Sequence, residues 1–441
     1  MMASPTELSN NVTRAASPID FNDANDSLAS AVRLIKSNDS LASADVELNY
    51  MEQAVAKVYP CIASVNFYTG DADKVAAFLQ ERTAAIVTAS PWLAGSIHSI
   101  DGKLNLRIPA KVDPEPNFTD ITMLELMPTM DNDRMHKLLE PVLVKSGVGA
   151  GGPLYRVVLV RTQPAKFAVV VSLHHGCADG STFYQLHGML DKRASVATLA
   201  SERDEAFSQA GVQQLLGERR VAWQTGLSVI SKTVATMAIP FLTSDVSTYT
   251  YMVDEAWVAQ QKALHKQGGA TEAAPYVSTN DILTSSLANA IGANWCLMNV
   301  DLRNHMVGLT KQLGGNYFGR MLHSREEFAT PGKIRERLQQ LGSQGTDGTT
   351  PSPLETWLSL DLVQVTNWSS LAVGKTLELQ SCEQILHVPL MKPPKLPGGY
   401  NVIVIFQATA SRLGVRLLTT RPEFADALSR VEGLTPFQVP T

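Results

Sequence analysis

The segment Leu173-His174-His175-Gly176-Cys177-Ala178-Asp179-Gly180 decides how the rest of the sequence is interpreted. It completes the run Phe167-Ala-Val-Val-Val-Ser-Leu173, whose unbroken apolar character is typical of a strand covered on both faces, so we expect this strand in the middle of a sheet. The spacing of Phe183, Leu186 and Leu190 then predicts a helix. The two histidines therefore lie where a buried strand ends and a helix begins, and such edges often carry reactive groups.

The two adjacent histidines are expected to have different roles. Neighbouring strand residues point to opposite faces, so at most one imidazole faces a given cleft while the other is satisfied inside the fold. A histidine at the end of a buried strand has a pKa suited to general-base catalysis near neutral pH. We expect a structural role for His174, whereas the residues alone leave His175 open between a base and a structural residue. Gly176 and Gly180 bracket a turn in which the backbone can approach a substrate.

Two other kinds of chemistry are less well supported by this segment. A metal site made by His174, His175 and Asp179 is disfavoured, because adjacent strand residues on opposite faces coordinate one ion poorly. We therefore expect no metal. Cys177 is interpreted as a small core residue, since no second base is assigned to activate it as a nucleophile.

Strand and helix patterns alternate on both sides of the segment. In the first half, the predicted elements are a strand at 61–68, a helix capped by Asp71 or Asp73 that stops before Pro91, a hairpin at 95–108 that turns at Asp101-Gly102, and a second hairpin made by 154–161 and 167–173. In the second half, they are strands at 248–253, 295–301, 401–407 and 414–419, a helix opened by the capping box of Ser278 and Asp281, and an exposed loop at 343–353.

Residues 191–245 show helical patterns without strand alternation, which indicates a boundary between lobes. The apolar stretch Leu227–Leu242 is too short for a membrane span and contains Lys232 and Pro240, so it is expected to be a helix packing on a core. The sequence predicts an α/β fold of two lobes, each a mixed, largely antiparallel sheet flanked by helices. The predicted boundaries are 1–195 for the N-terminal lobe, 196–245 for a helical connector and 246–441 for the C-terminal lobe.

The composition is that of an ordinary globular protein of 441 residues, with 44% hydrophobic and 18% charged residues. The net charge is −5 and there is no long basic run, which argues against nucleic-acid binding. The four cysteines are widely spaced without a Cys-x-x-Cys pair, so neither a disulfide framework nor a thiolate zinc site is expected. The first residues contain no apolar targeting segment. We expect a cytoplasmic monomer without a transmembrane segment.

The pattern His174-His175-x-x-x-Asp179-Gly180 resembles the signature of the chloramphenicol-acetyltransferase-like superfamily, which includes BAHD acyltransferases, condensation domains and wax-ester synthases. Four further stretches resemble BAHD motifs in the same order along the chain: Pro91–Gly95 ("P-x-L-A-G-R", with Ser96 in place of Arg), Ser278–Leu283, Val300–Arg303 ("V-D-x-R") and Gly315–Gly319 ("G-Y-F-G-N"). The Asp-Phe-Gly-Trp-Gly element of plant BAHD enzymes has no match near 370–390. The resemblance therefore supports the superfamily more strongly than the plant branch.

The resemblance implies roles for the motif residues. It implies His175 as catalytic base and Asp179 as the second motif residue, which points away from substrate and pairs with Arg303. A buried carboxylate needs such a partner, and the strand that carries Arg303 is otherwise apolar. His174, Arg303 and Gly180 would be structural support.

Thr366-Asn367-Trp368 resembles the Thr-Ser-Trp segment of the family, whose threonine and tryptophan line the reaction chamber. The threonine hydroxyl could stabilise the oxyanion of a tetrahedral intermediate. A threonine followed by a tryptophan also suits any strand, so this match leaves both interpretations open.

By resemblance, the two lobes meet along a tunnel and the protein transfers an acyl group from acyl-CoA, as co-substrate, to the hydroxyl or amine of a small-molecule acceptor. The resemblance implies neither a metal nor a resident cofactor. Three alternatives stay open: a carrier-protein donor as in condensation domains, a lipid-alcohol acceptor as in wax-ester synthases, and a non-catalytic binding relative. The acyl chain and the acceptor depend on a pocket built from distant segments, which the sequence does not specify.

Overall fold

The computed structural model describes residues 43–437, except 57–60, 146–147, 150, 205, 239–245, 343–347, 359, 372–375 and 392–399. The side chains of 236–238 are also outside the description. Residues 1–42, which the predicted N-terminal lobe included, and half of the predicted loop at 343–353 therefore lie outside the described residues. Everything below concerns the unit that begins at Ser43.

The first sheet has five strands in the order β12-β2-β7-β6-β5. Their bounds are Cys61–Thr69 for β2, Phe118–Thr122 for β5, Tyr155–Arg161 for β6, Lys166–His174 for β7 and Glu383–Leu390 for β12. The strand that precedes the two histidines, β7, is the central one, as predicted. Its side chains alternate between two hydrophobic clusters, with Val169 and Val171 in one and Ala168 and Val170 in the other. Both faces of β7 are therefore covered.

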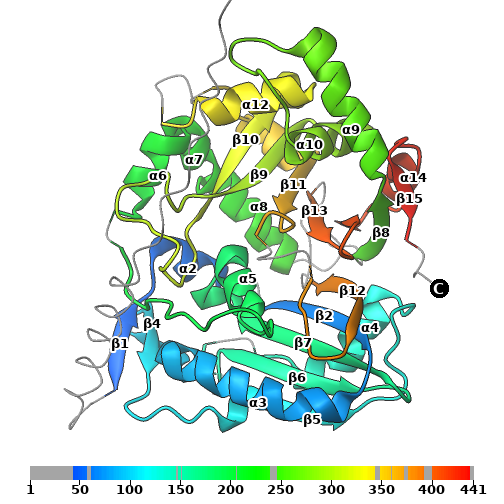
Figure 1. The fold of residues 1–441 in the computed structure, drawn as a ribbon. Helices are drawn as coiled ribbons and strands as arrows, with labels where there is room; N and C mark the ends of the chain where they lie inside the picture. The colour runs from blue at the N-terminus through cyan, green and yellow to red at the C-terminus, as the bar shows by residue number, and fades with distance from the viewer. Residues whose placement is uncertain are drawn as a thin grey trace, which may run out of the picture. The chain divides into compact units, whose positions relative to one another are not determined.

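Helix α3 (Ala72–Ala89) packs on one face of this sheet through Val75, Leu79 and Ile86. Figure 1 shows α3 running along the outside of the sheet. Asp71 caps the helix by accepting a hydrogen bond from the Asp73 backbone N–H, so the first of the two predicted caps is the one used. The predicted hairpin follows as β3 (Ser96–Ile100) and β4 (Lys103–Ile108), with β1 (Ala44–Glu47) on its outer edge.

The second sheet has seven strands in the order β10-β9-β11-β13-β14-β8-β15. Their bounds are Ser247–Val253 for β8, Trp295–Asp301 for β9, Phe318–Ser324 for β10, Leu362–Asn367 for β11, Tyr400–Gln407 for β13, Leu413–Thr419 for β14 and Leu434–Pro436 for β15. Most neighbouring strands are antiparallel, whereas β11 is parallel to both β9 and β13.

One face of the seven-stranded sheet is covered by helices, and Figure 1 shows α9, α10, α12 and α14 along it. These helices are Glu255–Leu264 (α9), Thr279–Ala290 (α10), Pro331–Gln339 (α12) and Glu423–Ser429 (α14). The predicted capping box opens α10, because Ser278 accepts from the Asp281 backbone N–H and the Asp281 carboxylate accepts from the Ser278 N–H. The opposite face of the sheet carries the candidate site.

The remaining described helices connect these layers. They are α2 (Tyr50–Val55), α4 (Asn132–Leu139), α5 (Gly180–Gly188), α6 (Gln209–Leu216), α7 (Glu218–Gln224), α8 (Leu227–Ala238), α11 (Arg325–Phe328) and α13 (Pro353–Leu358), with short helical turns at Pro91–Ala94, Glu115–Asn117, Glu140–Val142, His175–Cys177 and His265–Gly269. The mixed α/β fold with helix-flanked sheets agrees with the prediction. The boundaries at 195 and 246 stay predictions, and one strand crosses them, since β12 from the second half joins the first sheet.

The apolar stretch that begins at Leu227 forms α8, and the expectation that it packs on a core is wrong for three apolar side chains in its described part, residues 227–235. Leu227, Ile230 and Val234 are exposed, because α8 lies beside a cavity that Val229, Ile230 and Val234 help to line. In the described part of the chain, no helix has the length and apolarity that crossing a membrane requires.

Candidate active site

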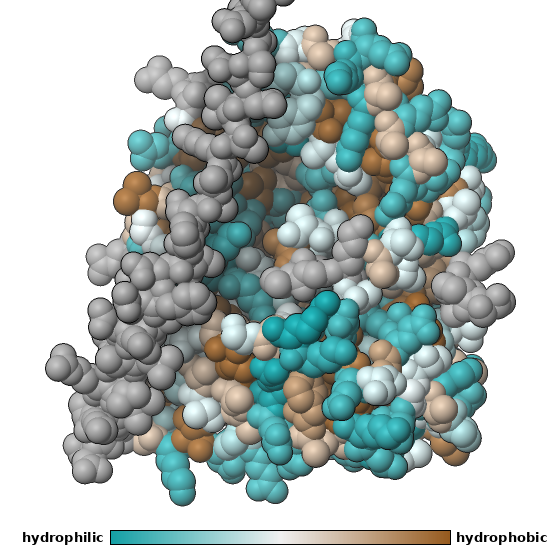
Figure 2. All heavy atoms as spheres, viewed as in Figure 1, coloured by the Kyte–Doolittle hydropathy of each residue, from teal (hydrophilic) through white to brown (hydrophobic). Residues whose placement is uncertain are grey.

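A cavity of about 1040 Å³ lies between the first sheet and the seven-stranded sheet. From the first half of the chain its wall includes Ile62, His175 and Gly180, and from the second half it includes strands β9, β10 and β11. The face in Figure 2 is hollowed between the two halves, with hydrophilic and hydrophobic side chains inside the hollow. Whether the cavity continues as a tunnel stays a prediction.

His174 is the last residue of β7 and lies in the interior, with 2% of its surface exposed. Its Nδ1 accepts a hydrogen bond of 3.0 Å from the Gly176 backbone N–H. Burial, together with the neighbouring His175 charge, lowers the pKa of His174 to about 4, so the ring is neutral near pH 7. Its Nε2 is buried without a partner among the described residues, and the structural role of His174 stays a prediction.

His175 begins the short turn after β7 and lines the cavity. Its Nδ1 lies 2.9 Å from the Ala178 carbonyl oxygen, which can only accept, so Nδ1 carries the proton and Nε2 is the basic atom of the neutral ring. Burial lowers the pKa of His175 from its ordinary value, and the hydrogen bond to Ala178 opposes only part of this effect. The Asn316 side chain donates to the His175 carbonyl oxygen at 2.8 Å and so holds the turn.

Asp179 and Arg303 form a buried ion pair, with Arg303 Nη1 2.8 Å from Asp179 Oδ2. Asp179 also caps α5 by accepting from the Thr182 backbone N–H, and it accepts from the Tyr317 backbone N–H. Burial alone would raise the pKa of Asp179, but the Arg303 charge and these hydrogen bonds outweigh it and hold the pKa below its ordinary value. The pair therefore joins the turn that carries His175 to the end of β9, and the pairing itself is the one that the resemblance implied.

The Arg303 guanidinium also donates hydrogen bonds to several other groups. Its Nη1 donates to Asp301 at 3.1 Å and its Nη2 donates to the Thr182 hydroxyl and to the Gly315 carbonyl oxygen. Its guanidinium lies over the Tyr317 ring. A second buried ion pair, which the sequence reasoning missed, lies on the other side of the turn, where Arg203 Nε and Glu52 Oε2 are 2.7 Å apart.

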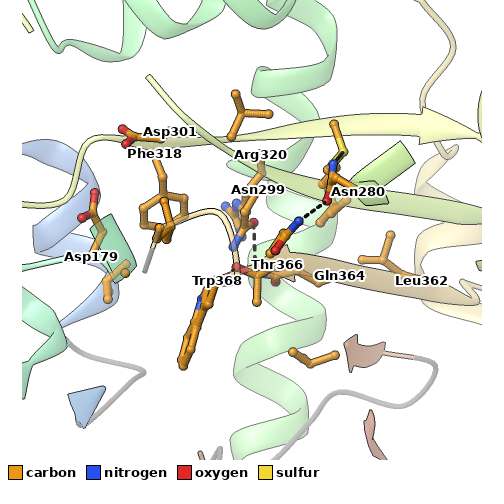
Figure 3. Close-up of a pocket in the computed structure, with 18 of the residues that line it drawn as sticks. Asp179, Asn280, Asn299, Asp301, Phe318, Arg320, Leu362, Gln364, Thr366 and Trp368 are labelled. Atoms are coloured by element: carbon orange, nitrogen blue, oxygen red, sulfur yellow. Dashed lines mark hydrogen bonds between the residues drawn. The ribbon is translucent and has the colours of Figure 1, made fainter. Parts of the chain in front are cut away.

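Thr366 and Trp368 both line the cavity, and Figure 3 shows them together at the end of β11. The Trp368 indole N–H donates to the Thr366 hydroxyl oxygen at 3.1 Å, so the hydroxyl proton is free to be directed to another acceptor. Gly180 allows this arrangement, because a Cβ at this position would stand only 3.3 Å from Trp368 Nε1. The Thr366 hydroxyl is thus oriented as a donor by a fixed neighbour.

Cys177 is fully buried and its thiol donates to the His174 carbonyl oxygen. Burial raises the pKa of Cys177 far above its ordinary value, so a nucleophilic thiolate is disfavoured. Among the described residues, no group of three or more histidine, cysteine, aspartate or glutamate side chains has a metal-binding arrangement.

The sequence reasoning also missed a polar row on the cavity floor. Asn299 accepts from the Gln364 side chain at 3.2 Å, and Asn367 donates to Asn280 at 3.1 Å, as drawn in Figure 3. Arg320, beside Asn299, completes the row. Strand alternation from the quoted Gly315–Gly319 motif would have placed Arg320 on the same face as Phe318.

No protein-family model matches the chain, and no curated protein matches it. Solved structures do match. TRI101 of F. graminearum complexed with coenzyme A and T-2 mycotoxin has a TM-score of 0.57 at 13% identity, over 88% of this chain and 98% of that one. Polyketide synthase associated protein 5 from Mycobacterium tuberculosis has a TM-score of 0.58 at 14% identity, over 88% and 97%.

TRI101 of F. sporotrichioides complexed with coenzyme A and T-2 also matches, with a TM-score of 0.57 at 13% identity over 88% of this chain and 98% of that one. At such identities the likeness shows the fold. The mixed α/β fold predicted from the sequence is therefore the fold of these structures, and membership of the chloramphenicol-acetyltransferase-like superfamily stays a resemblance.

Proposed function

We propose that this protein is an acyltransferase that moves an acyl group from a CoA thioester to the hydroxyl or amine of a small-molecule acceptor. The observation that carries this proposal is that His175, whose Nε2 is the basic ring nitrogen, and Thr366, whose hydroxyl can donate, line one cavity. At about 1040 Å³, that cavity is at the upper end of the range for ligand pockets. It therefore has room for the arm of a thioester donor and an acceptor at the same time.

The proposed reaction uses the two side chains in sequence. His175 Nε2 takes the proton from the acceptor O–H or N–H while that oxygen or nitrogen attacks the thioester carbonyl carbon. The Thr366 hydroxyl donates to the oxyanion of the tetrahedral intermediate. The C–S bond then breaks, and the His175 imidazolium returns its proton to the departing CoA thiolate.

Asp179 and Arg303 act in this proposal through position and not through proton transfer. Asp179 accepts three hydrogen bonds, one from Arg303 and two from backbone N–H groups, which occupy most of its acceptor sites. Its lowered pKa keeps it ionised at neutral pH. The pair fixes the turn that carries His175.

The comparisons bear on the choice of donor. The similar TRI101 structures were solved as complexes with coenzyme A and T-2 mycotoxin, coenzyme A and deoxynivalenol, and ethyl coenzyme A. The likeness to polyketide synthase associated protein 5 keeps a carrier-bound donor as the second candidate.

The test is a thiol-release screen of short and long acyl-CoAs against pooled alcohols and pooled amines. Release that requires both acyl-CoA and one pool supports the proposal, and the responding pool decides between O- and N-acylation. Release with an acyl-carrier protein but with no acyl-CoA would favour the second candidate. Tight CoA binding without acceptor-dependent release would indicate a non-catalytic relative.

A further inference from the structure

Three neighbouring strands present a row of side chains to the cavity floor. In the register of β10 and β9, Arg320 is directly opposite Asn299. In the parallel register of β9 and β11, Leu297 is aligned with Gln364. Two residues further along each strand, Asn299 is therefore beside Thr366. All of these residues line the cavity, and Figure 3 labels Arg320, Asn299, Gln364 and Thr366 near its centre. Arg320 is therefore two strands away from the hydroxyl proposed to hold the oxyanion.

The Arg320 guanidinium has no partner among the described residues. No hydrogen bond or ion pair reaches it there, and its Nε is buried without an acceptor. Other buried arginines in the described chain have side-chain partners: Arg303 binds Asp179, Arg203 binds Glu52, and Arg416 donates to Asn132. The cavity carboxylate nearest to Arg320 in the row, Asp301, is already bound by Arg303. Because Arg320 lines the cavity and has no anion there, a bound ligand with a negative charge would supply the partner that the described chain does not.

Two further donors lie near Arg320, and one of them, Asn299, lines the cavity. The Tyr50 hydroxyl is buried without a partner among the described residues, and it lies close enough to Arg320 to feel its charge. Asn299 accepts from Gln364 through its side-chain oxygen, so its own NH₂ group is a donor. The guanidinium of Arg320 and the amide of Asn299 on one cavity wall suit a carboxylate, which accepts several hydrogen bonds.

The position of the row indicates which substrate carries the anion. Two strand spacings separate the backbones of Arg320 and Thr366 by roughly 10 Å, and the arginine side chain shortens the gap to the reacting centre. In acyl-CoA, the pantetheine arm separates the thioester from the nearest phosphate by more than this distance. The CoA phosphates are therefore not the anion that Arg320 would bind. We propose that Arg320 binds a carboxylate on the acyl or the acceptor portion of the substrate pair, close to the transferred group. This inference rests on the proposed function.

Binding measurements test the inference without requiring turnover. The dissociation constants of malonyl-CoA, propionyl-CoA and CoA are measured by calorimetry for the wild-type protein, Arg320→Gln and Arg320→Lys. Thermal shifts are measured for pools of small hydroxy acids and for the corresponding amides. Arg156→Gln is the matched control, because Arg156 is also a partly buried arginine with an unpartnered Nε but lies on β6 outside the cavity wall.

We expect one carboxylated series to bind about tenfold or more tightly than its neutral counterpart, and Arg320→Gln to abolish this preference. Arg320→Lys should retain part of the carboxylate preference, and Arg156→Gln should retain all of it. The dissociation constant of CoA should stay within about twofold of the wild-type value in every variant. A preference for malonyl-CoA over propionyl-CoA would place the carboxylate on the acyl group. A preference for hydroxy acids over their amides would place it on the acceptor. Absence of any carboxylate preference in the wild-type protein, or a loss of CoA affinity in Arg320→Gln, overturns the inference. Failure of every form to bind CoA instead overturns the proposed function.

Discussion

The chemistry proposed here depends on which nitrogen of one imidazole carries a proton. The Ala178 carbonyl oxygen holds the proton of His175 on Nδ1, and burial keeps the ring neutral at physiological pH. A ring that is neutral at pH 7 can act as a base without first losing a proton. The same strand end buries His174 on its other side, where its environment suits packing.

The first prediction is that kcat/KM falls on the acid side with a midpoint below pH 6.5, the ordinary pKa of histidine. Burial lowers the pKa of His175, so the reactive neutral form persists to lower pH than in a solvent-exposed histidine. The measurement is a pH–rate profile between pH 4.5 and 8.5, with enzyme integrity checked at each pH. A midpoint at or above 6.5 would contradict the role assigned to this ring.

The second prediction concerns Cys177, two residues along the same turn. Its thiol is buried and its pKa is raised, so we expect no covalent acyl-enzyme. Intact-mass measurement after mixing with acyl-CoA in the absence of acceptor should find unmodified protein. An added acyl mass that disappears in Cys177→Ser would replace direct transfer by a two-step route.

At the scale of elements, the candidate site is made by joining the start of α5 to the end of β9. Asp179 caps the helix and also binds Arg303, so one carboxylate serves both elements. The two residues are 124 positions apart in the chain, and the motif containing each was recognisable in the sequence. The neighbouring ion pair of Glu52 and Arg203 was not recognisable in the sequence, because neither residue belongs to a distinctive local pattern.

The third prediction is that Asp179→Ala and Arg303→Ala are strongly non-additive in a double-mutant cycle. Removing either partner leaves a buried charge without full compensation and should cost about 3–5 kcal/mol of unfolding free energy. Removing the second partner should then cost much less. Urea denaturation of the four proteins gives the coupling energy. Simple addition of the two losses would mean that the pair does not connect the elements in solution.

At the scale of the whole molecule, the buried core contains histidines that must stay neutral for the protein to stay folded. His174, His187 and His387 are buried around the first sheet, and His323 is buried in β10. Burial lowers the pKa of His174 and of His187 to about 4 and that of His323 to about 3, and that of His387 also lies well below its ordinary value. Unfolding therefore takes up protons below pH 6.5.

The fourth prediction is that stability is fully present above pH 6.5 and is lost as the pH falls towards 4. Each buried histidine should lower the unfolding free energy by about 2 kcal/mol between pH 7 and pH 5, since the unfolded chain binds the proton first. The ring nitrogens of His323 have no partners among the described residues. Replacing His323 by leucine should reduce the number of protons taken up on unfolding between pH 6.5 and pH 4 by about one. Denaturation at several pH values measures it, with exposed His305→Leu as control. An unchanged slope in His323→Leu would refute the prediction.

Much of the fold was predictable because its patterns are local. The apolar run 167–173 identified the central strand, and Asp101-Gly102 identified a hairpin whose two turn residues both have positive φ. The membership of β12 in the first sheet was not predictable, since it depends on pairing between residues more than 300 positions apart. The exposed apolar side chains of α8 were misassigned, because periodicity does not distinguish a core from a cavity wall.

The candidate site divides in the same way. His175, Asp179, Arg303, Thr366 and Trp368 belong to short motifs, and their neighbourhood in the fold follows from recognising those motifs. The row from Arg320 to Gln364 has no motif, since its members meet only through strand register. Substrate preference depends on such side chains.

The most direct test of the central claim is acceptor-dependent thiol release from acyl-CoA by His175→Ala, measured beside the wild-type protein with the acceptor found in the screen. Circular dichroism and the CoA dissociation constant serve as controls for folding and donor binding. We expect both controls to be unchanged and turnover to fall by about 10²-fold or more, the usual effect of removing a positioned general base. Undiminished turnover in folded, CoA-binding His175→Ala would contradict the account.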